Sequence, residues 1–175
     1  MLFSLPKTLE VLEQTPRTLH SLLSNLSNDW VSANEGPETW SPFDVVGHLL
    51  HGDKSEWLSR AAIILSDSGD KHFKPFDRFA QLETSKGKTL NELLEEFSMV
   101  RSRNTELLRE WNLGPAELSK TGIHPKFGEV TLAQLLATWT VHDLDHIAQI
   151  SRVMARQYKE AVGPWSEFLR VVREG

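Results

Sequence analysis

Apolar residues recur at intervals of three and four along four stretches of the chain, and this spacing predicts four amphipathic helices. The first helix either begins at Leu9 and kinks at Pro16 or begins at Pro16 outright, and it ends near Leu26. The chain is therefore predicted to be nearly all helical. The other expected helices run over 42–66, 90–111 and 132–158, with a short terminal helix over 164–170.

Three of the expected helix starts carry the same capping pattern, a Ser or Thr followed three residues later by an acid or an amide. Pro42 strengthens the first of them, because the N–H that proline lacks is not needed at the first helical position. These pairs predict where three helices begin. They are Ser41 with Asp44, Thr89 with Glu92, and Thr131 with Gln134.

The segment over 67–88 mixes glycine and proline with Phe73, Phe76 and Phe79. A connection of this length is uncommon inside a compact domain and needs a structural reason. In a four-helix protein the usual reason is a crossover that joins two parallel helices. We therefore predict one all-α domain over residues 1–175, a four-helix bundle with a long crossover between its second and third helices.

Composition narrows the class of protein. Apolar residues make up 39% and charged residues 25% of the 175 residues, which is typical of a globular domain. The net charge of −5 argues against a general nucleic-acid-binding protein. The N-terminus lacks a basic region followed by a long apolar stretch, and no stretch approaches the roughly 20 apolar residues of a membrane span. We expect a cytoplasmic protein with neither a nucleic-acid nor a membrane partner.

Two histidines four residues apart are the most informative chemistry in the chain. His142 and His146 lie one turn apart on the fourth expected helix, on the apolar stripe that also carries Leu135, Trp139 and Val153. Imidazoles directed toward a core are good ligands for zinc and neighbouring transition metals. The chain has no cysteine, so a metal site has to be built from His, Asp, Glu and water.

The alternative is a pair of histidines at the edge of the core, bonded to the backbone or to Asp143 and Asp145. Burial of an unpaired imidazole is unfavourable, and this favours metal ligation for two histidines on the apolar stripe. The zinc-protease pattern His-Glu-x-x-His does not apply, because Asp143 stands where that pattern has its glutamate base. We therefore do not expect a metalloprotease.

A third ligand has to come from elsewhere in the chain, and His48 and His51 on the second expected helix are the best placed. Each lies past an opposite edge of that helix's apolar arc, so periodicity does not choose between them. Asp53 lies near the centre of the arc and either supports an imidazole N–H or forms a buried ion pair with Arg60 or Arg101. The other histidines, expected at surface or loop positions, are His20, His72 and His124.

Three short segments together resemble the DinB-like superfamily of metal-binding four-helix proteins. They are Trp40-Ser-Pro-Phe-Asp-Val-Val-Gly-His-Leu49, the stretch His124-Pro-x-Phe-Gly-x-Val-Thr131, and His142-Asp-x-Asp-His-x-x-Gln-Ile150. Their order and their placement on the second and fourth helices make the resemblance specific. It extends from about Leu9 to Tyr158.

The resemblance implies an up-up-down-down bundle and a metal held by one histidine of the second helix and two of the fourth. In such proteins the ligand of the second helix is followed by an apolar pair, which matches His48 and not His51. The implied metal ligands are therefore His48, His142 and His146. Several relatives carry an acid at the position of His51, so His51 is expected to line the pocket or to replace His48 in part.

Three protein ligands leave one coordination position open, as in catalytic rather than structural zinc sites. Zinc is the expected ion, with nickel, iron, manganese and copper as alternatives. By resemblance, we expect a homodimer and a small-molecule substrate, with a low-molecular-weight thiol as cosubstrate of a metal-dependent S-transferase reaction.

Two other functions stay open, because no nucleophile or strong base is evident in the sequence and no catalytic residue is assigned. The first is a metal-binding, stress-related bundle without catalytic turnover. The second is a metal-dependent hydrolase, which would need a carboxylate near the metal, with Asp53 and Asp145 as candidates. Gln149, close to His146 on the fourth helix, is expected either to support a ligand or to act in catalysis.

Overall fold

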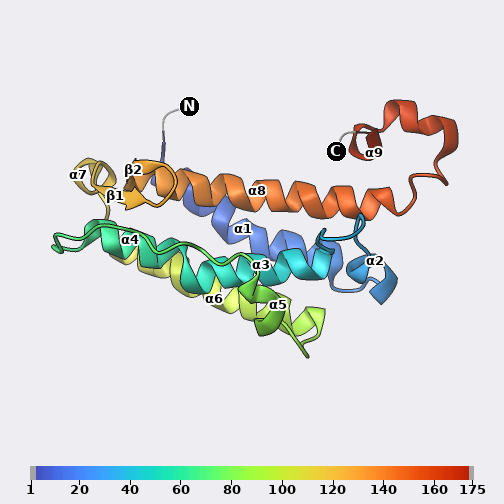
Figure 1. Cartoon of the computed structure of the whole chain (residues 1–175), viewed down its shortest axis with the longest axis horizontal. Helices are drawn as coiled ribbons and strands as arrows, with labels where there is room; N and C mark the ends of the chain where they lie inside the picture. The colour runs from blue at the N-terminus through green and yellow to red at the C-terminus, as the bar shows by residue number, and fades with distance from the viewer. Residues whose placement is uncertain (1–2, 174–175) are drawn as a thin grey trace.

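The computed structural model describes residues 3–173, and most of them form four helical rods that lie side by side (Figure 1). The chain is mostly helical and has a four-helix bundle at its centre, as the apolar spacing predicts. No helix of the described residues is long and apolar enough to cross a membrane. The rods are α1 (Leu5–Leu23), α3 with α4 (Pro42–Ser55 and Trp57–Leu65), α6 (Leu90–Glu110) and α8 (Leu132–Arg156).

All three predicted capping boxes are present. The hydroxyl of Ser41 accepts from the backbone N–H of Asp44 at 3.2 Å, and Thr89 and Thr131 cap α6 and α8 in the same way. The first helix differs from the prediction, because it begins at Leu5 and continues through Pro16.

The directions of the rods follow from the two apolar clusters of the core. One cluster joins the beginnings of α1 and α8 to α4 and the end of α6, whereas the other joins the ends of α1 and α8 to the beginnings of α3 and α6. Hence α1 and α8 run one way and α3–α4 and α6 run the other, as the colours of Figure 1 also show. The order is up-down-down-up, so the up-up-down-down order expected from the resemblance is wrong.

The long crossover does join two parallel rods, α4 and α6, and it contains the short helix α5 (Ala80–Thr84). Gly47 of α3 makes room for it, since a Cβ there would lie 2.5 Å from the hydroxyl of Ser85. The crossover therefore packs closely on α3, where His48 is the next residue.

The entry into α8 is a β-hairpin, which the sequence analysis did not predict. Strand β1 (Thr121–His124) pairs antiparallel with β2 (Gly128–Thr131). The hairpin is tied to the crossover by two backbone hydrogen bonds of 2.9 Å, between Phe73 and Ile123 and between Ile123 and Lys71. At Gly122 a Cβ would lie 2.6 Å from the Phe73 ring, so only glycine allows this close contact.

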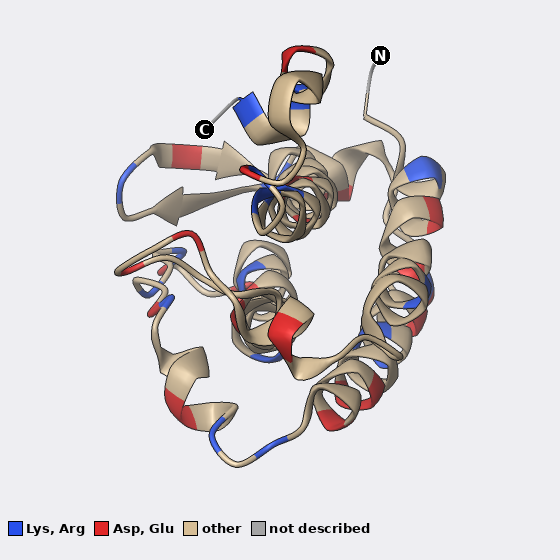
Figure 2. Cartoon of the chain, turned by 90° about the vertical axis from the view of Figure 1, so that its right-hand side faces the viewer, with Lys and Arg blue, Asp and Glu red and all other residues tan. Residues whose placement is uncertain are grey.

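Short helical turns complete the chain. The terminal helix expected over 164–170 is a 3₁₀ turn followed by one turn of α-helix, both beyond the end of α8 (Figure 1). Lys and Arg are interspersed with Asp and Glu along the rods, seen end-on in Figure 2. The short helices are α2 (Asn28–Ser32), α7 (Pro115–Leu118), η1 (Gly163–Phe168) and α9 (Arg170–Arg173).

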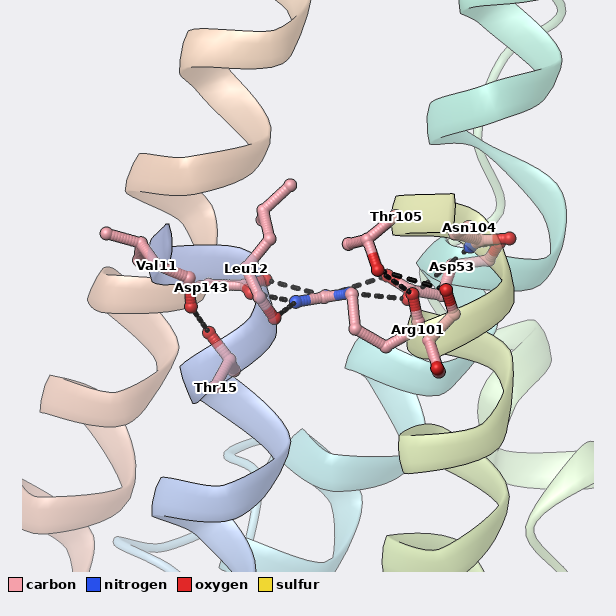
Figure 3. Close-up of polar contacts among 9 residues, drawn as sticks. Val11, Leu12, Thr15, Asp53, Arg101, Asn104, Thr105 and Asp143 are labelled. Atoms are coloured by element: carbon pink, nitrogen blue, oxygen red, sulfur yellow. Dashed lines mark hydrogen bonds and ion pairs between the residues drawn. The ribbon is translucent and has the colours of Figure 1, made fainter. Parts of the chain in front are cut away.

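An arginine lies in the middle of the bundle, between the two apolar clusters. Arg101 is 1% exposed and its guanidinium stacks near Phe97 of one cluster and Trp139 of the other, at 4.8 and 5.1 Å from the ring centroids. It forms buried ion pairs with Asp53 of α3 and Asp143 of α8 (Figure 3). Of the two roles open for Asp53, the buried ion pair with Arg101 is therefore the one observed.

Candidate metal centre

Three histidines from two helices meet beside this core. The Nε2 atom of His142 lies 3.1 Å from that of His48 and 3.1 Å from that of His146. Tetrahedral zinc with imidazole ligands at about 2.0–2.1 Å places neighbouring nitrogens about 3.3 Å apart. Both distances are close to that spacing, and the three ligand atoms all lie within 4.8 Å of one another, as ligands of one divalent ion would. Among residues 3–173, they form the one group of three His, Asp or Glu ligands found this close together.

The helices explain why these three side chains meet. His142 and His146 are one turn apart on α8, and α3 runs antiparallel to α8 and presents His48 opposite them. His51 is half-buried and lies outside the cluster, with its ring beside Phe76 at 5.1 Å between centroids. The structure thus brings together the three expected histidines and leaves His51 as a neighbour.

Burial keeps the cluster neutral. Desolvation, together with the neighbouring His146, lowers the pKa of His48 and of His142 to about 3. The pKa of His146 is also lowered by its burial, although its hydrogen bond to Gln149 opposes the shift. Neutral imidazole has a free lone pair on one ring nitrogen, so the three rings are in the protonation state that binds a metal ion at neutral pH.

Gln149 selects the tautomer of one ring. Its Oε1 atom lies 2.7 Å from Nδ1 of His146. An amide oxygen can only accept a hydrogen bond, so Nδ1 carries the proton and the lone pair of Nε2 faces the cluster. Gln149 is therefore positioned to orient His146, which is one of the two roles left open for it.

Aromatic rings hold the other two histidines. Trp40 packs on His48 with ring centroids 4.7 Å apart, and Trp57 meets His142 edge-on at 5.1 Å. The Nδ1 atoms of His48 and His142 are buried and have no hydrogen-bond partner among residues 3–173. These two atoms lie on the other side of each ring from Nε2, so a bound ion would not satisfy them. The fit to an ion comes from the Nε2 atoms, which face one another inside an apolar shell.

A cavity of about 370 Å³ adjoins the cluster and is bordered by α3, α4, α8, the crossover and the hairpin. This volume suits a small molecule. Most of its wall is aromatic or aliphatic, and charged or polar groups interrupt it at a few places. Its lining residues are His48, Glu56, Trp57, Arg60, Phe73, Phe76, Arg78, His124, Phe127, Val130, Gln134, Leu135, Thr138 and His142.

The carboxylate that lines this cavity was not among our candidates. Asp53 is buried away from the cavity with both oxygens bonded to Arg101, at 2.7 and 2.8 Å, and Asp145 is exposed on α8. Glu56 lines the cavity instead. It follows His48 by eight residues, about two helical turns, and this spacing was the available indication. His124 also lines the cavity, although it is no part of the cluster.

One family model and two curated relatives match most of the chain. The family model described as the DinB superfamily matches residues 11–150. Two curated relatives are each named "Putative metal-dependent hydrolase". The chain is 22% identical to the one from Oceanobacillus iheyensis over 147 residues, 83% of each protein. It is 24% identical to the one from Bacillus mycoides over 152 residues, 86% of this chain and 85% of that protein.

A solved structure has the same fold. YfiT from Bacillus subtilis superposes with a TM-score of 0.74 at 22% identity, over 87% of each chain. Its description is "a probable metal-dependent hydrolase with an unusual four-helix bundle topology". That likeness concerns the fold, including a bundle topology that departs from the common ones.

Proposed function

The chain belongs to the DinB superfamily, and from this premise we propose that it is a metal-dependent hydrolase whose ion is held by His48, His142 and His146. The observation that carries the proposal is the convergence of three neutral imidazoles, with Nε2 of His142 3.1 Å from that of His48 and of His146. His48 and His142 also line a cavity that a small molecule can enter.

The residues present fit such an ion. A divalent metal bound by three protein ligands keeps a position for water or substrate and acts there as a Lewis acid. The chain supplies imidazoles that burial keeps unprotonated, and Gln149 aims one of them. Zinc is the ion we propose, since three imidazoles suit it; nickel, iron, manganese and copper are the alternatives that elemental analysis would distinguish.

Two observations support hydrolysis over the thiol transfer expected from the sequence. The curated relatives are named metal-dependent hydrolases, and YfiT is described in similar terms. Within the chain, the carboxylate of Glu56 lines the same cavity as His48 and His142, and a carboxylate there suits proton transfer in hydrolysis. Both favour the hydrolase that we had ranked as an alternative.

The experiment is a paired assay of tag-free protein. Zinc-loaded protein is tested on a panel of small esters and amides, and in parallel for conjugation of a small thiol to an electrophile. The proposal predicts hydrolysis that a chelator abolishes, zinc restores and His142→Ala removes, with His51→Ala as the matched control that keeps the activity. Thiol conjugation without hydrolysis would overturn it, and absence of both would favour a binding protein without turnover.

A further inference from the structure

Glu56 interrupts the second rod of the bundle at the level of the cavity. It separates α3 from α4 and has φ −113° and ψ −65°, outside ordinary helical geometry. Its backbone N–H still bonds to Gly52 and its carbonyl still accepts from Arg60, each at 2.9 Å. The backbone is therefore distorted at Glu56, although helical hydrogen bonds continue on both sides of it. Trp57 also packs closely on the preceding turn, because a Cβ at Gly52 would lie 3.2 Å from its indole nitrogen.

The side chain of Glu56 is held in the wall that contains the histidines. It is 11% exposed, it forms an ion pair with Arg60, and it borders the same cavity as His48 and His142. Arg60 is in turn fixed over the ring of Phe73, 5.3 Å from its centroid. Among the described residues that line the cavity, Glu56 is the one carboxylate.

Glu35 makes a useful comparison with Glu56. Both side chains have similar surface exposure, 11% for Glu56 and 10% for Glu35, and both pair with arginine, but Glu56 lies deeper among protein atoms. Hydrogen bonds and charge from Arg152 and Arg156 lower the pKa of Glu35, whereas burial raises the pKa of Glu56 although Arg60 opposes the shift. A carboxylate whose pKa is raised toward neutrality can both accept a proton and return it. Glu35 lies outside the lining of the cavity.

We propose that Glu56 is the proton-transfer residue of this site. The inference rests on the proposed function and adds a catalytic residue to it. The carboxylate takes a proton from the attacking water while the water oxygen bonds to the carbonyl carbon of an ester or amide. The bond from that carbon to the leaving group then breaks, and the proton passes from Glu56 to the leaving oxygen or nitrogen. No further reactant is needed, and the carboxylate is restored.

The first test does not depend on turnover. Protein loaded with cobalt(II) is titrated from pH 5 to 10, and its visible absorption reports groups that titrate beside the ion. A carboxylate that contacts water in the cavity disfavours loss of a proton from that water. We expect Glu56→Gln to move the absorption change down by about one pH unit, and the matched control Glu35→Gln to leave it in place. A change at the same pH in wild type and Glu56→Gln would overturn the assignment.

The second test measures rate with 4-nitrophenyl acetate as the probe, at equal metal content and with thermal melting to confirm folding. Removing a general base costs typically 10²–10⁴-fold, so kcat of Glu56→Gln should fall at least about 100-fold. Glu35→Gln should keep the rate. Full activity in Glu56→Gln would contradict the inference alone. Failure of the wild type to bind cobalt or zinc would contradict the proposed function itself, so the two failures are distinguishable.

Discussion

Two buried polar clusters share helices α3 and α8 and differ in how completely their hydrogen-bonding groups have partners. In the arginine cluster, Arg101 uses all five of its N–H donors, on Asp53, Asp143 and the carbonyl of Leu12 (Figure 3). In the histidine cluster, three Nε2 atoms point at one another and two Nδ1 atoms have no partner among residues 3–173. The first is complete within the chain and the second is not.

The two clusters are neighbours on both helices. His142 precedes Asp143 on α8, and His48 precedes Asp53 on α3 by five residues. Burial alone therefore does not separate a structural polar group from a functional one. The residues of the arginine cluster do not line the 370 Å³ cavity, whereas His48 and His142 do. The histidine cluster also has nitrogen lone pairs available to bind a ligand.

The largest loss of unfolding free energy should come from removing Arg101 from the arginine cluster. Arg101→Met leaves Asp53 and Asp143 buried without their counterion, and breaking such a group costs about 3–5 kcal/mol. Urea unfolding of the metal-free protein measures this loss. Arg109→Met on the same helix is the control, because its pair with Glu13 is largely exposed and should contribute under about 1 kcal/mol. Equal losses in both variants would remove the distinction between the clusters.

The next largest effect should be a loss of metal affinity when the ring of His146 is no longer held in its orientation. Gln149→Leu removes the acceptor that fixes the tautomer of His146, and loss of such a partner weakens metal binding by about 10- to 100-fold. Competition with a chelating dye measures the affinity. Ser151→Ala, an exposed residue on the same helix, should leave it unchanged. Unaltered affinity in Gln149→Leu would show that the ring needs no such support.

The pH dependence of stability should identify the histidine cluster. Burial holds the pKa of His48 near 3, against 6.5 for an exposed histidine. The stability contributed by the neutral ring is present above pH 6.5 and is lost as the pH falls toward 3, because the unfolded chain gains the proton first. Between pH 7.5 and 5.0 the metal-free wild type should lose about 2 kcal/mol more than His48→Leu. Parallel pH curves for the two proteins would argue against a buried neutral ring.

The smallest effect should come from removing a histidine at pH 7.5 without metal. His48→Leu replaces an imidazole that has an unsatisfied Nδ1 by an apolar side chain in an aromatic shell. Loss of packing and relief of the buried polar atom oppose each other, so unfolding free energy should change by less than about 1 kcal/mol. A loss as large as that of Arg101→Met would mean that the histidines hold the bundle together.

Local chemistry made part of this molecule predictable. The three capping boxes place the starts of α3, α6 and α8 correctly, because a cap is read from four consecutive residues. His142 and His146 could be paired from helical spacing alone, whereas the choice of His48 came from the family resemblance. Gln149 follows His146 by three residues, so its contact also lies within reach of the sequence.

Features that depend on distant contacts were not predictable from the pattern. The directions of the rods depend on which faces pack together across the bundle, and the expected order was wrong. The apolar spacing over 42–66 is continuous, so one unbroken helix was expected, whereas Glu56 separates α3 from α4. The candidate carboxylates Asp53 and Asp145 do not line the cavity, because Asp53 pairs with Arg101 of another helix and Asp145 is exposed. The homodimer and the cytoplasmic location stay predictions.

The central claim is that three histidines bind one metal ion, and metal content tests it most directly. Tag-free wild type, His142→Ala and His51→Ala are incubated with zinc, dialysed and measured by elemental mass spectrometry. We predict about one ion per chain in wild type and in His51→Ala, and none in His142→Ala. Wild-type protein that holds no ion after this treatment, or His142→Ala that holds as much as wild type, would contradict the account.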